Sequence, residues 1–159
     1  MLRYLIVWYA VPMDRPPLLP PIGVRLARTA RVATQAFERA MAEAGSTASA
    51  WQVLVLVRSQ RWGAQSEMAE AMGISGATLT HHLNALEDQG LVRRWRESSN
   101  RRVQHVELTD AGIELFDRLR KVATRHDQRL RAQLSDEETA RLAELLDKLQ
   151  AGLDPPPDR

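Results

Sequence analysis

Five arginines lie within residues 91–105, and in that window only Glu97 carries the opposite charge. A protruding arginine can enter the minor groove of DNA, where the negative potential is strongest. A run of charged residues is more often a solvated face, so the meaning of this cluster depends on the elements that present it. The five residues are Arg93, Arg94, Arg96, Arg101 and Arg102.

A β-hairpin is predicted to carry the cluster. Residues 91–96 (LVRRWR) are apolar at the start and basic at the end, and residues 97–100 (ESSN) have the polar composition of a turn. Residues 103–109 (VQHVELT) are β-prone, with Val106 and Leu108 two apart on one face. We therefore expect Arg101 and Arg102 at the tip of the hairpin.

A helix-turn-helix pattern comes immediately before the hairpin. Residues 65–72 favour a short helix, residues 73–75 (GIS) favour a turn, and residues 76–89 favour a second helix closed by Gly90. Gly73 suits the turn because it has no side chain to clash at positive φ, and the Ser75 hydroxyl is a candidate N-cap. The second helix of such a motif enters the DNA major groove. In this context the arginine cluster favours DNA binding.

The second helix has an apolar face and a polar face. Leu79, His82, Leu83 and Leu86 recur at helical spacing and form the apolar face. Side chains off that face should approach base edges, and the small residues at the helix start should allow close approach to the groove. The predicted DNA-binding residues are Ser75, Gly76, Ala77, Thr78, Thr80, His81, Asn84, Arg94, Arg101 and Arg102.

Composition limits the classes of function. The chain of 159 residues is long enough for one domain, or for one compact unit with a dimerisation element. The net charge is only +2, so the basic character is local. The absence of cysteine excludes disulfides and thiolate chemistry. The four histidines lack tight ligand spacing, and neither a phosphate-binding loop nor a nucleophile–base signature is present. We expect no metal, no cofactor and no catalytic residue.

Both ends of the chain are expected to lie outside the main fold. Residues 2–11 (LRYLIVWYAV) are apolar but too short to span a bilayer. They lack the convincing cleavage site that a secretory signal would have. We therefore expect a cytoplasmic protein with no membrane contact. Residues 1–22 are an N-terminal extension or reflect a start assigned too early, with Met13 as the alternative start. Residues 154–159 are expected to form a disordered tail.

Long amphipathic helices are predicted on both sides of the central motif. Residues 23–44 carry a stripe that includes Phe37, residues 110–134 carry one that includes Phe116, and residues 135–153 carry a stripe of leucines. These stripes exceed what a small monomer buries, which favours a two-fold homodimer. The predicted fold class is mainly α with a small β-wing. It combines a winged helix-turn-helix DNA-binding domain over 48–109 with a helical dimerisation region over 23–47 and 110–153.

Several aromatic and histidine side chains have two interpretations. The predicted helix over 48–60 is strongly apolar, so Trp51 is most simply a core residue, with the wall of a ligand pocket as the alternative. His82 and His126 lie on apolar faces, where a packed, hydrogen-bonded histidine is favoured over a ligand or a pH sensor.

Short motifs spread over about residues 27–153 carry a resemblance to a known family. They are Trp51, residues 67–69 (EMA), 72–75 (MGIS), 78–80 (TLT), 86–94 (LEDQGLVRR) and 108–112 (LTDAG). Each motif is weak alone, but their order and spacing are specific. Together they resemble the multiple-antibiotic-resistance regulator (MarR) family of winged helix-turn-helix repressors.

The resemblance implies a homodimer on a pseudo-palindromic operator, with the recognition helix in the major groove and a wing arginine in the minor groove. It also implies release from DNA by a small aromatic compound, for which the candidate pocket residues are Trp51, Val55, Phe37 and Phe116. This chain departs from the family pattern at three positions. Asn100 replaces the aspartate that usually braces the wing, so we expect a less rigid wing. His81 stands where an arginine is frequent, and His82 where an apolar residue is usual. A winged-helix module that contacts only protein is the alternative, but it has no need of five wing arginines.

Overall fold

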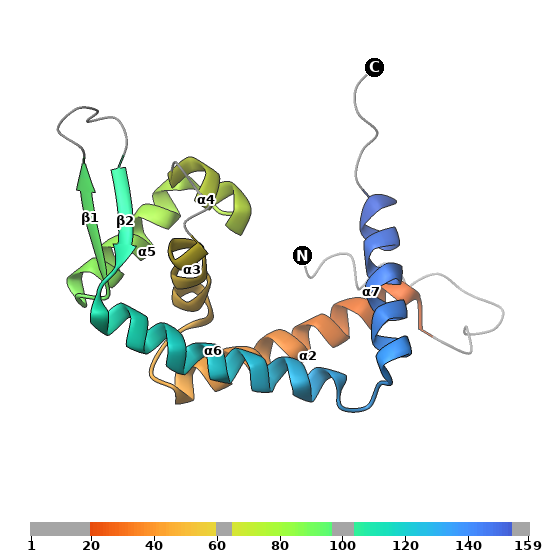
Figure 1. Ribbon diagram of the computed structural model, residues 1–159. Coiled ribbons are helices and arrows are strands. Elements are labelled where there is room, and N and C mark those ends of the chain that lie inside the picture. The colour runs from red at the N-terminus through yellow and green to blue at the C-terminus, as the bar shows by residue number, and fades with distance from the viewer. Residues whose placement is uncertain (1–19, 60–64, 97–103, 154–159) are drawn as a thin grey trace, which may run out of the picture. The chain divides into compact units, whose positions relative to one another are not determined.

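The computed structural model describes residues 20–59, 65–96 and 104–153 (Figure 1). This part of the chain is mainly helical with one two-stranded antiparallel sheet, which confirms the predicted fold class. The chain forms two compact units, Met1–Thr34 and Gln35–Arg159, and the site described below lies within the second. The elements are α2 (Ile22–Glu43), α3 (Ala48–Ser59), α4 (Gln65–Met72), α5 (Gly76–Asp88), β1 (Val92–Arg96), β2 (Gln104–Leu108), α6 (Asp110–Arg131) and α7 (Asp136–Ala151).

Polar side chains cap the starts of three helices. Ser75 caps α5 as predicted, its Oγ accepting from the backbone N–H three residues on at 3.1 Å. Thr109 caps α6 in the same way, also at 3.1 Å. At the start of α7, Ser135 and Glu138 form a reciprocal capping box. Each cap satisfies donors that the first turn of a helix leaves without a partner, and so helps to fix where the helix begins.

Glycines in the left-handed region separate the helices around the turn motif. Gly73, between α4 and α5, has φ +65°, and Gly90, between α5 and β1, has φ +69°. Residues with a Cβ rarely adopt this conformation, so both predicted turns are confirmed. Helix α6 ends at Arg131, before the predicted end at residue 134, because a turn must precede the Ser135 cap of α7.

The core of the unit Gln35–Arg159 forms where α3 packs against α5 and α6. Val53 and Leu54 of α3, Leu79 and Leu83 of α5, and Leu119 of α6 are completely buried. Helix α4 packs on α5, and β2 packs on α3. Burial of one leucine side chain contributes about 1.5–3 kcal/mol. This packing fixes the rotation of α5, so that its apolar face lies inside and its polar face lies outside.

The start of α6 lies close to the start of the hairpin. The Thr109 hydroxyl donates a hydrogen bond to the carbonyl oxygen of Gly90 at 2.6 Å, and the Thr109 N–H donates to the carbonyl oxygen of Leu91 at 3.1 Å. A Cβ atom at Gly112 would lie 1.9 Å from the same Leu91 oxygen. Position 112 therefore requires glycine, and this close approach holds α6 against the base of the β-ribbon.

Helix α7 keeps an apolar stripe at the surface. None of its residues is buried, and Leu142, Leu145, Leu146 and Leu149 are 40–45% exposed. No helix in the described ranges is both long and apolar enough to cross a membrane. The use of this stripe for dimerisation, and the predicted division into domains, stay predictions.

Candidate nucleic-acid interface

The polar face of α5 is open to solvent. Thr78, Thr80, His81 and Asn84 are exposed, whereas the leucines on the opposite face are buried. The other predicted contacts at the helix start, Ser75, Gly76 and Ala77, are also exposed. His82, expected on the apolar face, is half-buried, with its ring centroid 6.1 Å from that of His81. The structure thus leaves seven of the predicted DNA-binding residues accessible, at the start of α5 and along its polar face.

The first turn of α5 is internally hydrogen-bonded. The hydroxyls of Ser75 and Thr78 lie 2.8 Å apart, and the Thr80 hydroxyl donates to the carbonyl oxygen of Gly76 at 2.9 Å. These bonds hold the side chains in defined positions without covering the helix N-terminus. A helix N-terminus attracts anions because its first N–H groups lack intrahelical partners. This end of α5 is therefore suited to a DNA phosphate.

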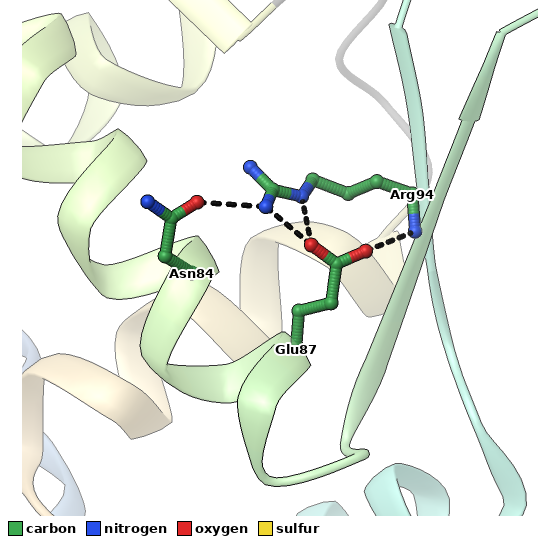
Figure 2. Close-up of polar contacts among 3 residues, drawn as sticks. All are labelled: Asn84, Glu87 and Arg94. Atoms are coloured by element: carbon green, nitrogen blue, oxygen red, sulfur yellow. Dashed lines mark hydrogen bonds and ion pairs between the residues drawn. The ribbon is translucent and has the colours of Figure 1, made fainter.

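Arg94 of β1 is bound to the carboxylate of Glu87 on α5 (Figure 2). Its Nε donates to Glu87 Oε2 at 2.7 Å, its backbone N–H donates to Oε1 at 3.2 Å, and a guanidinium NH2 group forms an ion pair with Oε2. The same NH2 group donates to Asn84 Oδ1 at 2.7 Å. The hydrogen bond from the Arg94 side chain lowers the pKa of Glu87 below its ordinary value, against an opposing effect of burial.

These contacts change the interpretation of Arg94. The sequence suggests a free cation aimed at DNA, but the Arg94 side chain is only 17% exposed and its charge is balanced by Glu87. It joins α5 to β1. A direct contact between Arg94 and DNA stays a prediction.

Arg93 of β1 is also paired. It lies opposite Glu107 in the β-ladder, and its Nε donates to Glu107 Oε1 at 2.7 Å. Within residues 91–105 Glu97 is the single acidic residue, but Glu87 and Glu107 approach the cluster from outside that window. The pair remains at the surface, with 71% of the Arg93 side chain exposed.

The tip of the predicted wing lies outside the described residues. This applies to Arg101, Arg102 and Asn100, so their roles stay predictions. The ribbon below the tip is supported by an aromatic pair that the sequence analysis missed. Trp95 of β1 stacks on His105 of β2, with ring centroids 4.2 Å apart and planes 16° from parallel. The antiparallel register, which places position 95 opposite 105, is the signal that could have revealed it.

The candidate effector residues pack mostly within the chain. The Trp51 ring stacks on that of Phe116, and the Phe37 ring contacts that of His126 with centroids 5.1 Å apart. Phe37, Trp51 and Phe116 are partly buried against the core, so the two phenylalanines are less available to a partner chain than predicted. Val55 is 37% exposed.

A groove of about 510 Å³ lies between the second half of α2 and α6. Its cationic side chains come from one face of α6, and small apolar residues form part of its lining. His126, which contacts Phe37, also lines it. The lining residues are Ala36, Ala40, Glu43, Ala44, Arg118, Lys121, Val122, Arg125, His126 and Arg129.

Comparisons with known proteins also indicate a transcriptional regulator. Residues 47–103 match the MarR family. The chain is 29% identical over 129 residues to the protein assigned as a transcriptional regulatory protein for the hcr operon of Thauera aromatica, covering 80% of this chain and 78% of that protein. It is 30% identical over 106 residues to the uncharacterised HTH-type transcriptional regulator YdgJ of Bacillus subtilis, covering 67% of this chain and 65% of that protein.

Solved structures share the fold. The chain is 30% identical to the transcriptional repressor CouR bound to a 23-mer DNA duplex, with a TM-score of 0.73 over 82% of this chain and 92% of that one. It has the fold of the Staphylococcus aureus MepR–DNA complex, with 22% identity and a TM-score of 0.76 over 85% and 100%. An exposed helix beside a β-ribbon is a winged-helix arrangement, and the comparisons identify its class as a DNA-binding transcriptional regulator. The chain belongs to the MarR family.

Proposed function

We propose that this protein is a homodimeric repressor that binds a pseudo-palindromic operator and leaves it when a small aromatic ligand binds. The observation that carries the proposal is the exposed polar face of α5, held beside the β-ribbon by Arg94. Thr78, Thr80, His81 and Asn84 read base edges in the major groove, and Arg101 and Arg102 contact the minor groove or its phosphates. The likeness to CouR, a transcriptional repressor, supports repression over activation.

Selection of binding sites from random duplex DNA, followed by fluorescence anisotropy, tests the operator. We expect one preferred sequence and an affinity that falls steeply with salt, since each phosphate contact adds about 0.9 to the slope of log affinity against log salt. Arg102→Ala should weaken all sequences alike, whereas His81→Ala should relax preference at particular base pairs. The absence of a preferred site, with a flat salt response, would instead support a module that contacts only protein.

The homodimer is supported by the leucine stripe of α7, whose side chains are about two-fifths exposed. A two-fold dimer would bury the stripe and place two recognition helices in successive major grooves, roughly 34 Å apart. Light scattering at micromolar concentration should give twice the mass of the chain. Leu145→Asp should weaken both dimerisation and DNA binding. The matched control is Ala140→Asp, an exposed position away from the leucine stripe by helical periodicity. A monomeric wild-type protein would contradict the proposal.

An aromatic carboxylate is the ligand class that the groove between α2 and α6 favours. Arg118, Lys121, Arg125 and Arg129 offer positive charge there, and the alanines offer apolar contact. A ligand shifts DNA affinity only if it prefers one of two conformations of the protein. Titration with phenolic carboxylates should therefore change tryptophan emission and release DNA together.

Arg125→Ala tests this groove, and Arg120→Ala is its matched control. Arg120 lies on the same helix but does not line the groove, and it pairs with Asp117. Only the first variant should weaken the response to ligand. An equal response in the two variants would place the ligand elsewhere.

A further inference from the structure

We propose that Arg94 fixes the carboxamide of Asn84 so that Asn84 presents only N–H donors to DNA. Asn84 would then favour an acceptor edge in the major groove, guanine N7 and O6 or thymine O4, over adenine, whose N6 group is a donor. This inference rests on the proposed function of α5 as the helix that reads DNA. It assigns Asn84 as a specificity-determining residue and Arg94 as the residue that positions it.

The orientation of the Asn84 amide follows from the chemistry of its partner. Arg94 NH2 lies 2.7 Å from Asn84 Oδ1. A guanidinium group has five N–H donors and no acceptor, so only the oxygen of the amide can face it. Figure 2 shows the amide nitrogen of Asn84 pointing away from both Arg94 and Glu87. Asn84 is exposed, so its N–H donors are available to DNA.

Arg94 cannot easily turn to release the amide. Glu87 accepts hydrogen bonds from the Arg94 backbone N–H at 3.2 Å and from its Nε at 2.7 Å, which holds both ends of the side chain. Glu87 and Asn84 are three residues apart on α5 and therefore share one helix face. If Arg94 left for a DNA phosphate, the Glu87 carboxylate would remain unpaired near a polyanion. That electrostatic cost favours keeping the contact in the DNA complex.

The fixed orientation changes which base Asn84 can read. Asparagine usually recognises adenine with two hydrogen bonds, its oxygen accepting from N6 and its nitrogen donating to N7. Here the oxygen faces Arg94, and a nearby guanidinium disfavours the approach of the donor at adenine N6. The two N–H donors match N7 and O6 of guanine, or O4 of thymine. Adenine N7 can also accept one of them, but the neighbouring N6 donor of adenine then faces the N–H donors of Asn84, which disfavours adenine.

Binding-site selection with four proteins tests the inference: wild type, Asn84→Ala, Arg94→Met and Arg93→Met. One base pair of the wild-type site should lose its preference for guanine or thymine in Asn84→Ala, with a loss of discrimination of about 5- to 150-fold. At the same base pair, Arg94→Met should gain adenine, because the amide can then rotate. Arg93→Met is the matched control, since Arg93 is also on β1 and ion-paired but is bound to Glu107. It should leave that preference unchanged.

A base analogue tests the wild-type protein directly, in case Arg94→Met fails to fold. Replacing guanine with 7-deazaguanine at that base pair, or thymine with 4-thiothymine, should weaken wild-type binding but not binding by Asn84→Ala. A wild-type preference for adenine at the Asn84-dependent base pair would overturn the inference. So would a folded Arg94→Met variant with unchanged preference, or an analogue without effect. Failure of the proposed function is distinct, because wild type would then select no site at all.

Discussion

The indole ring of Trp51 stacks on the ring of Phe116, with centroids 5.3 Å apart and planes inclined by 25°. Trp51 lies on α3 and Phe116 lies on α6, and both side chains are partly buried against the core. Stacked aromatic pairs contribute about 0.5–1.5 kcal/mol beyond the area they bury. The pair therefore adds to the packing of α6 on the core, in which Leu119 of α6 is itself completely buried.

Trp51→Ala should lower the free energy of unfolding by about 2–4 kcal/mol, because it removes the stack and leaves a cavity beside the core. Trp51→Phe keeps an aromatic ring there and should cost less. Trp95→Ala, which removes an exposed ring stacked on His105, should cost about 1 kcal/mol. Urea unfolding followed by far-UV circular dichroism measures all three. Equal losses in Trp51→Ala and Trp95→Ala would contradict the assigned role of the Trp51–Phe116 pair.

Gly112→Ala should destabilise the protein by about 3 kcal/mol or more, since overpacking forces the backbone to move. The new Cβ would lie 1.9 Å from the backbone oxygen of Leu91, which is not the flexible end of a side chain. Gly23→Ala is the control. Gly23 lies in α2, and a Cβ added there would meet no atom within 4 Å, so that variant should be neutral or slightly more stable. Thermal unfolding distinguishes them, and a Gly112→Ala melting temperature equal to wild type would refute the close approach.

Local signals explain why the helix-turn-helix could be predicted from sequence. Gly73 and Gly90 need no long-range information, because a left-handed backbone favours glycine wherever it occurs. Ser75 caps α5 through a hydrogen bond to a residue three positions away. The apolar spacing of Leu79, Leu83 and Leu86 then predicts which face of the helix is buried.

The electrostatics of the wing could be predicted only in part. The pairing of Arg93 with Glu107 follows from the hairpin register, and Glu107 lies outside the window of residues 91–105 in which the charges were counted. The contact between Arg94 and Glu87 depends on how the turn at Gly90 brings the end of α5 beside β1, which no local pattern specifies. The packing of Phe116 on Trp51 likewise depends on tertiary structure, because an apolar stripe on a helix does not specify which other surface packs against it.

Glu87→Gln should reduce stability at neutral pH and change it less in acid. The pKa of Glu87 in the folded protein lies below the ordinary value of 4.5, chiefly because of the Arg94 side chain. The ion pair therefore contributes fully above the unfolded pKa, and this contribution is lost as the pH falls through the folded pKa. Urea unfolding at pH 7 and pH 3 should show the two proteins converging at the lower pH. In an Arg94→Gln background, Glu87→Gln should lose this pH-dependent effect. If wild type and Glu87→Gln differ in stability by the same amount at both pH values, the ion pair does not contribute as described.

Glu107→Gln should strengthen binding to all DNA sequences alike. It removes the carboxylate paired with Arg93 and leaves the exposed Arg93 guanidinium without that ion pair. One additional phosphate contact would steepen the slope of log affinity against log salt by about 0.9, without a change in base preference. Anisotropy titrations over a range of salt concentrations measure this slope, and Glu107→Gln combined with Arg93→Gln should return it to the wild-type value. If the slope stays steeper in the double variant, the lost negative charge alone explains the effect. A changed base preference would show that Glu107 acts on α5 instead.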